Sequence, residues 1–213
     1  MPLEPSSFVL KALATISKSA WTAWQQQRID GKRQILFEEL SAGKIHVMHA
    51  IDQDELFACF HRFDRAAIEG SAHYKLQLMA RVLRGQIEGG CLIADEFQTF
   101  AEIIASLREP ELKYISALYS AEQQFPEAWT TDDGSKPLRD KLVAELIPKV
   151  FTSVEEMNAV GTALQRTALV MSGGITWNGE ILFRTTPLMK TFVDLARLEP
   201  ESEVRPGRTD PTF

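Results

Sequence analysis

Residues 153–198 read SVEEMNAVGTALQRTALVMSGGITWNGEILFRTTPLMKTFVDLARL and decide the fold expected for this chain. The stretch opens on Ser153 and Glu156, a capping-box pattern in which a hydroxyl and a carboxylate satisfy free amides at a helix start. Apolar residues then recur at helical spacing as far as Ala168. The sequence therefore predicts a helix over residues 153–168 with one buried stripe.

The second half of the same stretch predicts a β-hairpin and a closing helix. The helical period breaks at Leu169–Met171, which suits the start of a buried strand. Asn178-Gly179 is a strong signal for a type I′ hairpin turn, and residues 180–184 alternate enough to form the returning strand. Thr186-Pro187 then opens a helix, because proline is best tolerated in the first helical turn.

Two further helices are expected upstream of this stretch. Apolar side chains at helical spacing predict one helix over residues 110–124 and another over residues 135–150. The second opens on Ser-Lys-Pro and places its leucines, valines and isoleucine on one face. Pro126 and the polar residues 130–134 separate the two helices and are typical of a loop.

This order of elements resembles a bacterial winged-helix domain of the kind found in transcriptional regulators. The segment ALQRTALV is similar to the family's end of the recognition helix and first wing strand. The segment FRTTPLMKTFVDL is similar to its second wing strand and following helix. The resemblance spans residues 109–198, under half of the chain, and is a pattern of residue types. It implies a winged helix-turn-helix with one β-hairpin over residues 108–198.

The resemblance also implies that the exposed face of the helix over residues 153–168 enters the major groove of a DNA duplex. Asn, Gln and Arg side chains have the donor and acceptor geometry that base edges require. The expected base contacts are Asn158, Thr162, Gln165 and Arg166, and the expected phosphate contacts are Lys141 and Arg184.

The charge of this region departs from that expectation. Duplex affinity rests largely on Lys and Arg side chains that neutralise phosphates. Residues 108–197 hold 10 basic and 12 acidic residues. The expected recognition helix contains one arginine and two acidic residues, Glu155 and Glu156. Two hypotheses therefore stand. The protein is a DNA-binding transcriptional regulator or accessory factor, or it is an adaptor whose winged helix and N-terminal helices bind other proteins.

The N-terminal half, residues 1–107, is expected to be a helical bundle that mediates self-association or binds a protein partner. Helical patterns follow one another there with short separations, which suggests four or five antiparallel helices. We expect a break in the first long helix near Asp30-Gly31. Capping-box patterns at Asp52 with Glu55, and at Asp95 with Gln98, predict two helix starts. Residues 199–213 are proline-containing and polar, and are expected to form a disordered tail.

Composition narrows the class of protein. The net charge of −6 argues against a non-specific nucleic-acid coat protein and a polybasic membrane anchor. The two cysteines, Cys59 and Cys91, form no C-x-x-C pattern and fit a reducing compartment. No apolar run has the length of a transmembrane helix, and the N-terminus lacks the pattern of a signal peptide. These features predict a cytoplasmic protein.

Metal binding, membrane contact and catalysis are three further hypotheses, and each has a simpler alternative in the sequence. His46 and His49 precede Asp52, Asp54 and Glu55, which are conceivable metal ligands, but the segment lacks a second ligand pair in register. An indole-rich first helix could contact a membrane surface, although such a stripe more often packs in a core. The chain contains no phosphate-binding, nucleotide-binding, nucleophile-elbow or zinc-protease motif. We therefore expect no catalysis, no metal and no cofactor.

Overall fold

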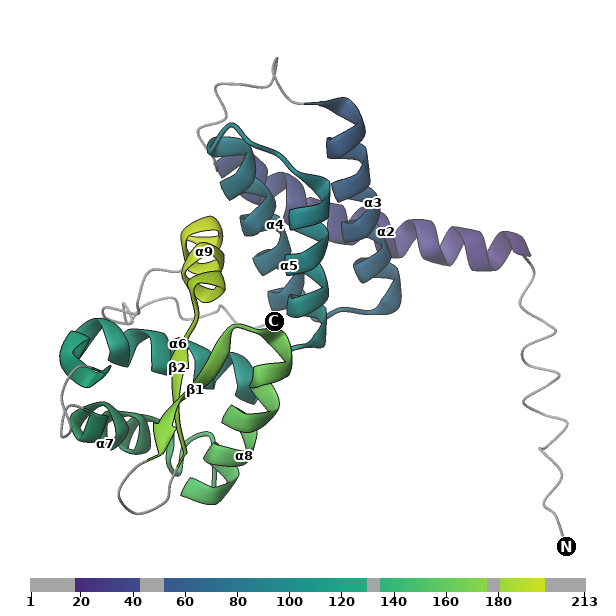
Figure 1. Cartoon of the computed structure of the whole chain (residues 1–213). Coiled ribbons are helices and arrows are strands. Elements are labelled where there is room, and N and C mark those ends of the chain that lie inside the picture. The colour runs from purple at the N-terminus through teal and green to yellow at the C-terminus, as the bar shows by residue number, and fades with distance from the viewer. Residues whose placement is uncertain (1–17, 43–51, 130–134, 176–180, 198–213) are drawn as a thin grey trace, which may run out of the picture. The chain divides into compact units, whose positions relative to one another are not determined.

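The structure is a computed structural model that describes residues 18–42, 52–129, 135–175 and 181–197 (Figure 1). The chain divides into two compact units, Met1–Ala105 and Ser106–Phe213. Both are mainly helical, and the described residues form one small antiparallel sheet of two strands in the second unit. The expectation of a mainly α protein with one β-hairpin is confirmed at this level.

The first unit contains α2 (Lys18–Ala42), α3 (Gln53–Glu69) and α4 (His73–Glu88), with α5 (Ala94–Ser106) following them. The expected break at Asp30-Gly31 is absent, because α2 runs through both residues as a continuous helix. A glycine inside a helix costs only about 1 kcal/mol relative to alanine. α2 packs against α3 and α4, and this packing outweighs the local preference (Figure 1).

Ion pairs hold α2 to its neighbours. The Arg33 guanidinium donates two hydrogen bonds to the Asp64 carboxylate of α3, one to each oxygen. Glu39 lies between two arginines of α4, with Arg81 Nε at 3.1 Å and Arg84 Nη1 at 2.9 Å from its carboxylate oxygens. The fully buried side chains of α3 to α5 are apolar, and the largest are Phe63, Leu76, Met79, Leu83, Phe97, Phe100 and Ile104.

The helix starts in this unit differ from the capping boxes that the sequence predicted. The Asp52 carboxylate does accept a hydrogen bond from the Asp54 amide, at 2.8 Å, so the first cap is confirmed. Glu55, however, turns away from that helix start and accepts the amide hydrogen of Ala94. Ala94 is the first residue of α5, so a carboxylate from α3 satisfies one of its free amides. Sequence spacing alone could not reveal this partner, which is 39 residues away.

The second unit runs α6 (Glu109–Gln124), η2 (Pro126–Trp129), α7 (Ser135–Leu146), α8 (Val154–Leu164), η3 (Gln165–Thr167), β1 (Val170–Ile175), β2 (Ile181–Thr185) and α9 (Pro187–Ala196). The order agrees with the sequence prediction, but two helices are shorter. α7 ends at Leu146, just before Pro148, which cannot continue a helix. α8 ends at Leu164 in a 3-10 turn that leads to Ala168, whose φ is 57°.

The hairpin is fixed by polar contacts at its base. β1 and β2 pair from Val170 opposite Thr185 to Ile175 opposite Ile181, with an irregularity at Gly173. The Thr185 amide donates to a Glu122 carboxylate oxygen at 2.9 Å, and the Thr185 hydroxyl bonds the same carboxylate. Thr186 caps α9 as predicted, because its hydroxyl oxygen accepts the Met189 amide at 3.3 Å. The predicted Asn178-Gly179 turn lies outside the described residues.

Tyr114 of α6 lies at the centre of the second unit's core. Its ring makes edge contacts with Phe151, at a centroid distance of 6.3 Å, and with Phe183 of β2, at 6.4 Å. α8 approaches this cluster at Gly161, where an added Cβ would lie 2.6 Å from the Phe183 ring and 3.0 Å from the Tyr114 hydroxyl. On the hairpin, Gly173 lies under the Trp129 ring, which leaves no room for a side chain there. These close approaches fix α8 and the hairpin against α6.

Candidate interaction surface of the second unit

The first turn of α8 presents two ionised carboxylates to solvent. Ser153 caps the helix by accepting the Glu156 amide at 3.3 Å. The Glu156 carboxylate does not complete the predicted box on the Ser153 amide but accepts from Thr152 N and Thr152 Oγ1, both at 2.7 Å. These backbone and hydroxyl hydrogen bonds lower the pKa of Glu156. Backbone and Ser153 hydrogen bonds likewise lower the pKa of Glu155, so both side chains are negative at neutral pH.

The outward row of α8 consists of Glu155, Ala159 and Thr162, which are exposed at helical spacing and include no basic residue. Asn158 beside them is partly buried. The Thr162 hydroxyl donates to the Asn158 carbonyl at 3.0 Å. Gln165 is exposed at the start of η3. Four predicted base-contacting residues therefore lie on or just after α8, but only Arg166 among them carries a positive charge.

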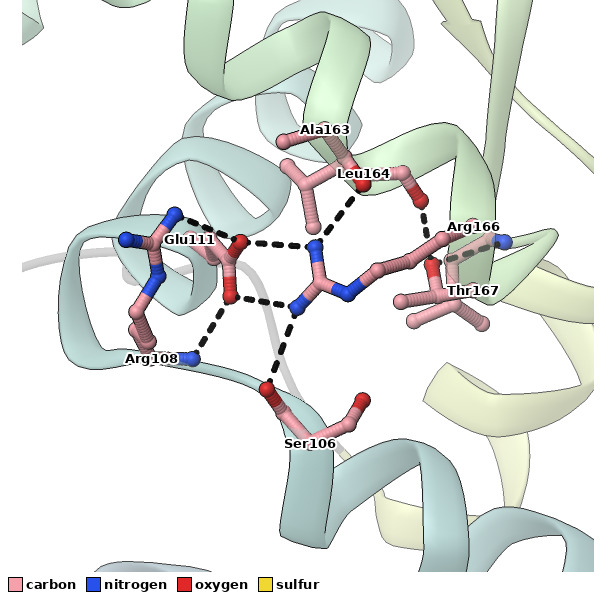
Figure 2. A network of polar contacts seen from close by, with 8 residues as sticks. Ser106, Arg108, Glu111, Ala163, Leu164, Arg166 and Thr167 are labelled. Carbon is pink, nitrogen blue, oxygen red and sulfur yellow. Dashed lines mark hydrogen bonds and ion pairs between the residues drawn. The ribbon is translucent and has the colours of Figure 1, made fainter.

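Figure 2 shows that the Arg166 guanidinium lies against Glu111 of α6. Arg166 Nη1 and Nη2 donate to the two Glu111 carboxylate oxygens at 2.8 and 2.9 Å. The same nitrogens donate to the backbone carbonyls of Ala163, at 2.8 Å, and Ser106, at 3.1 Å. The side chain is 41% exposed. Its hydrogen-bonding fork is nevertheless directed at the protein itself.

Glu111 is the residue that organises this network. Its side chain is fully buried, and it also accepts the Arg108 amide at 2.7 Å and Arg108 Nη2 at 3.1 Å (Figure 2). Burial by itself would raise the pKa of Glu111 and is the largest single influence. The hydrogen bonds from Arg166 and from the Arg108 backbone and side chain together outweigh it and lower the pKa to about 2. Glu111 is therefore an anion whose partners are provided by the fold.

The sequence analysis did not identify Glu111. The spacing of Arg108 and Glu111 carries a partial signal, because a carboxylate at the third helical position commonly reaches back to the cap amide. Nothing local points to Arg166, which is 55 residues further along the chain. The capping pattern could thus have indicated the bond to the Arg108 amide but not the buried ion pair.

The two predicted phosphate contacts lie on other elements. Lys141 is on α7, where its Nζ is 3.9 Å from a Glu145 carboxylate oxygen. Arg184 is exposed on β2, directly opposite the exposed Met171 of β1. Of the side-chain hydrogen bonds that the structure describes, only the one from the Thr162 hydroxyl to the Asn158 carbonyl joins two of the six predicted site residues.

The hairpin also carries exposed apolar side chains. Met171 is 41% exposed and Ile181 is 40% exposed, both high values for large apolar residues. Methionine and arginine are among the residue types enriched where proteins bind one another. We use the term candidate interaction surface for these two exposed regions of the second unit, the hairpin and the outward row of α8.

The described residues contain no group of three or more His, Cys, Asp or Glu side chains able to hold a metal ion. The conceivable ligands His46 and His49 lie outside those residues, and so do the side chains of Trp21 and Trp24. Among the helices described, none has the length and apolar character needed to cross a membrane. Comparison with protein families, curated proteins and solved structures found no match to this chain.

Proposed function

We propose that the second unit is a winged-helix-like module that acts as a non-catalytic protein-interaction adaptor. In this interpretation α6, α7 and α8 form the three-helix core, the β1–β2 hairpin is the wing, and α9 closes the module. The observation that carries the proposal is the distribution of charge on α8. Its first turn presents Glu155 and Glu156, and the nearest arginine, Arg166, is bonded to a buried carboxylate.

This charge arrangement is unfavourable for duplex DNA. In helix-turn-helix proteins the N-terminal residues of the reading helix lie closest to the base edges. Glu155 and Glu156 would occupy that place and would meet the phosphate-lined walls of the groove. Because neutralised phosphates supply most of the binding free energy, two ionised carboxylates there oppose association. A protein partner has no such requirement, and the exposed Met171, Ile181 and Arg184 offer it apolar and cationic contacts.

Site-specific photo-crosslinking tests the proposal. A photoreactive amino acid is placed at Thr162 of α8 or Met171 of β1, in cells that naturally contain the protein. Lys190, exposed on α9, is the control position. We expect protein adducts of discrete size from Thr162 and Met171, resistant to nuclease treatment and absent from Lys190. Adducts that nuclease removes, or no adducts at either position, would overturn the proposal.

The DNA-binding hypothesis stays a prediction and has its own test. Fluorescence anisotropy with random-sequence duplex DNA at low salt is expected to detect no salt-dependent binding. Arg166→Glu is unsuitable as a loss-of-binding variant, because it places a second carboxylate against buried Glu111 and would disturb the fold. Thr162→Glu and Arg184→Glu, both at exposed positions, are the correct variants. Wild-type binding that either variant abolishes would establish DNA binding in place of the adaptor role.

A further inference from the structure

A second surface of the same unit has a defined shape. A groove of about 410 Å³ runs between α6 and α7. One wall comes from α6 and the other from α7 with the turn that follows it. Its lining residues are Ser116, Ser120, Gln124, Lys141, Ala144, Glu145 and Lys149. None of them belongs to α8 or to the hairpin, so the groove is separate from the candidate interaction surface.

The two walls share a four-residue spacing. On α6 the polar residues Ser116, Ser120 and Gln124 recur every fourth position, and Gln124 Nε2 donates to Ser120 Oγ at 3.4 Å. The other wall repeats the same interval with charged residues, in the order Lys141, Glu145 and Lys149. Four helical residues rise about 6 Å, so Ser116 to Gln124 on α6 spans roughly 12 Å and Lys141 to Glu145 on α7 about 6 Å. Lys149 continues the second wall in the turn after α7.

The charges on the second wall alternate from positive to negative to positive. Lys141 Nζ and Glu145 Oε2 are 3.9 Å apart, too far for a hydrogen bond, and their side chains are 40% and 42% exposed. Lys149 is exposed in the turn after α7. The donors and acceptors of this row are therefore only weakly engaged with one another and can take up groups from a partner.

The lining chemistry distinguishes between possible occupants. Small-molecule pockets are lined predominantly by apolar and aromatic side chains, whereas Ala144 is the one apolar residue among the seven that line this groove. A nucleic-acid strand presents an even row of phosphates, and one of these would lie against Glu145 if two others met the lysines. A polypeptide can alternate its charges and so complement all three groups.

We propose that the α6–α7 groove binds a helix of a partner protein that presents acidic, basic and acidic side chains at positions i, i+4 and i+8. Lys141 and Glu145 have this interval on α7 and match the partner's first acidic and its basic side chain. Lys149 lines the same groove in the turn after α7 and offers a cation to the second acidic side chain. The short side chains of Ser116, Ser120 and Ala144 permit close approach, since the distance between packed helices depends on the side chains at the contact. The inference deepens the proposed function and rests on it, because it names a partner chemistry for the protein-binding unit.

Two labelled peptides test the inference against the full-length protein. Both are about 18 residues long and alanine-rich, because shorter helices are marginal in water. One presents Glu, Lys and Glu at four-residue spacing, and the other presents Lys, Glu and Lys. Fluorescence anisotropy at low salt is expected to show preferential binding of the Glu-Lys-Glu peptide. Because exposed ion pairs are individually weak, we expect a preference of about tenfold.

A charge-reversed variant supplies the decisive comparison. Lys141→Glu, Glu145→Lys and Lys149→Glu together change the net charge by −2, and so does the control Lys190→Glu on α9. We expect the triple variant to invert the preference between the two peptides, and the control to leave it unchanged. Circular dichroism checks that both variants remain folded.

Three results would overturn the inference: no binding of either peptide, no preference between them, or the same loss of binding in the control. Displacement of the peptide by millimolar inorganic phosphate would also overturn it, by showing a simple anion site. If neither peptide binds preferentially while the crosslinks from Thr162 and Met171 appear, only this inference is wrong and the proposed adaptor role is retained. Absence of the crosslinks with a retained peptide preference would overturn the proposed role of α8 and the hairpin and would support protein binding at the groove alone.

Discussion

Replacing Arg166 with methionine removes the cation that faces buried Glu111 and leaves a side chain of similar length. A carboxyl whose pKa falls from 4.5 to about 2 on folding is stabilised as an anion by about 3 kcal/mol. Arg166 supplies two of the hydrogen bonds to Glu111, and Arg108 supplies the others. Arg166 is 41% exposed, and solvent screening reduces its share, so we expect a loss of about 2 kcal/mol at pH 7.

The pH dependence gives the prediction its distinctive signature. The pKa of Glu111 is lower in the folded protein than in the unfolded chain. The contribution of the pair is therefore complete above about pH 4.5 and is lost as the pH falls toward 2. The free-energy difference between wild type and Arg166→Met should be constant from pH 7 to pH 5 and should shrink below that.

Urea unfolding followed by circular dichroism measures this difference at each pH. The two units can unfold separately, so hydrogen–deuterium exchange of peptides from α6 and α8 locates the transition that shifts. Lys190→Met, which also removes a cation from an exposed side chain, is the control and should change stability by less than about 0.5 kcal/mol. An unchanged urea midpoint for Arg166→Met, or a loss that is the same at pH 3 and pH 7, would refute the reasoning.

Two substitutions and one alkylation experiment test other contacts in the chain. Gly161→Ala should destabilise the second unit by about 1–2 kcal/mol in thermal or urea unfolding, because overpacking against the core rings outweighs the gain in helix propensity; a more stable variant would contradict the packing. Mass spectrometry after iodoacetamide treatment at pH 8 should find Cys91 alkylated and Cys59 protected, since burial first and the Glu55 charge second raise the pKa of Cys59 to about 12. Glu55→Ala should cost about 1 kcal/mol and speed amide exchange at the start of α5, where Ala94 loses its acceptor; unchanged exchange there would disprove that cap.

The part of the fold that the sequence predicts well is the part fixed by near neighbours. Asp52 and Thr186 cap their helices as expected, because each acceptor lies two or three residues from the amide it satisfies. Helix starts and the order of elements in the second unit follow from such local chemistry. The misplaced helix ends have local causes too: Pro148 stops α7, and a left-handed Ala168 closes the turn after α8.

Contacts between distant residues account for what the sequence analysis missed. Glu55 and Glu111 both have capping-box spacing, yet each has a partner that only the fold brings near, at separations of 39 and 55 residues. The absent break at Gly31 has the same origin, since packing of α2 on α3 and α4 overrides a weak local preference. The groove between α6 and α7 could likewise not be predicted from the sequence, because its two walls become neighbours only when the helices pack together.

Arg166 illustrates why a residue type alone does not define a binding site. A guanidinium fork fits the acceptor pair on a guanine and the two oxygens of a carboxylate equally well. The sequence could therefore assign the fork to DNA, but the chain itself supplies a buried carboxylate at bonding distance. A buried Glu111 without this partner would be costly, so the bond to Arg166 is a requirement of the fold before it is available for any ligand. The surface that is left on α8 is then acidic and polar, and exposed cations lie elsewhere, among them Arg184 on the hairpin and Lys149 at the α6–α7 groove. This redistribution of charge is the reason to seek protein partners for the second unit first.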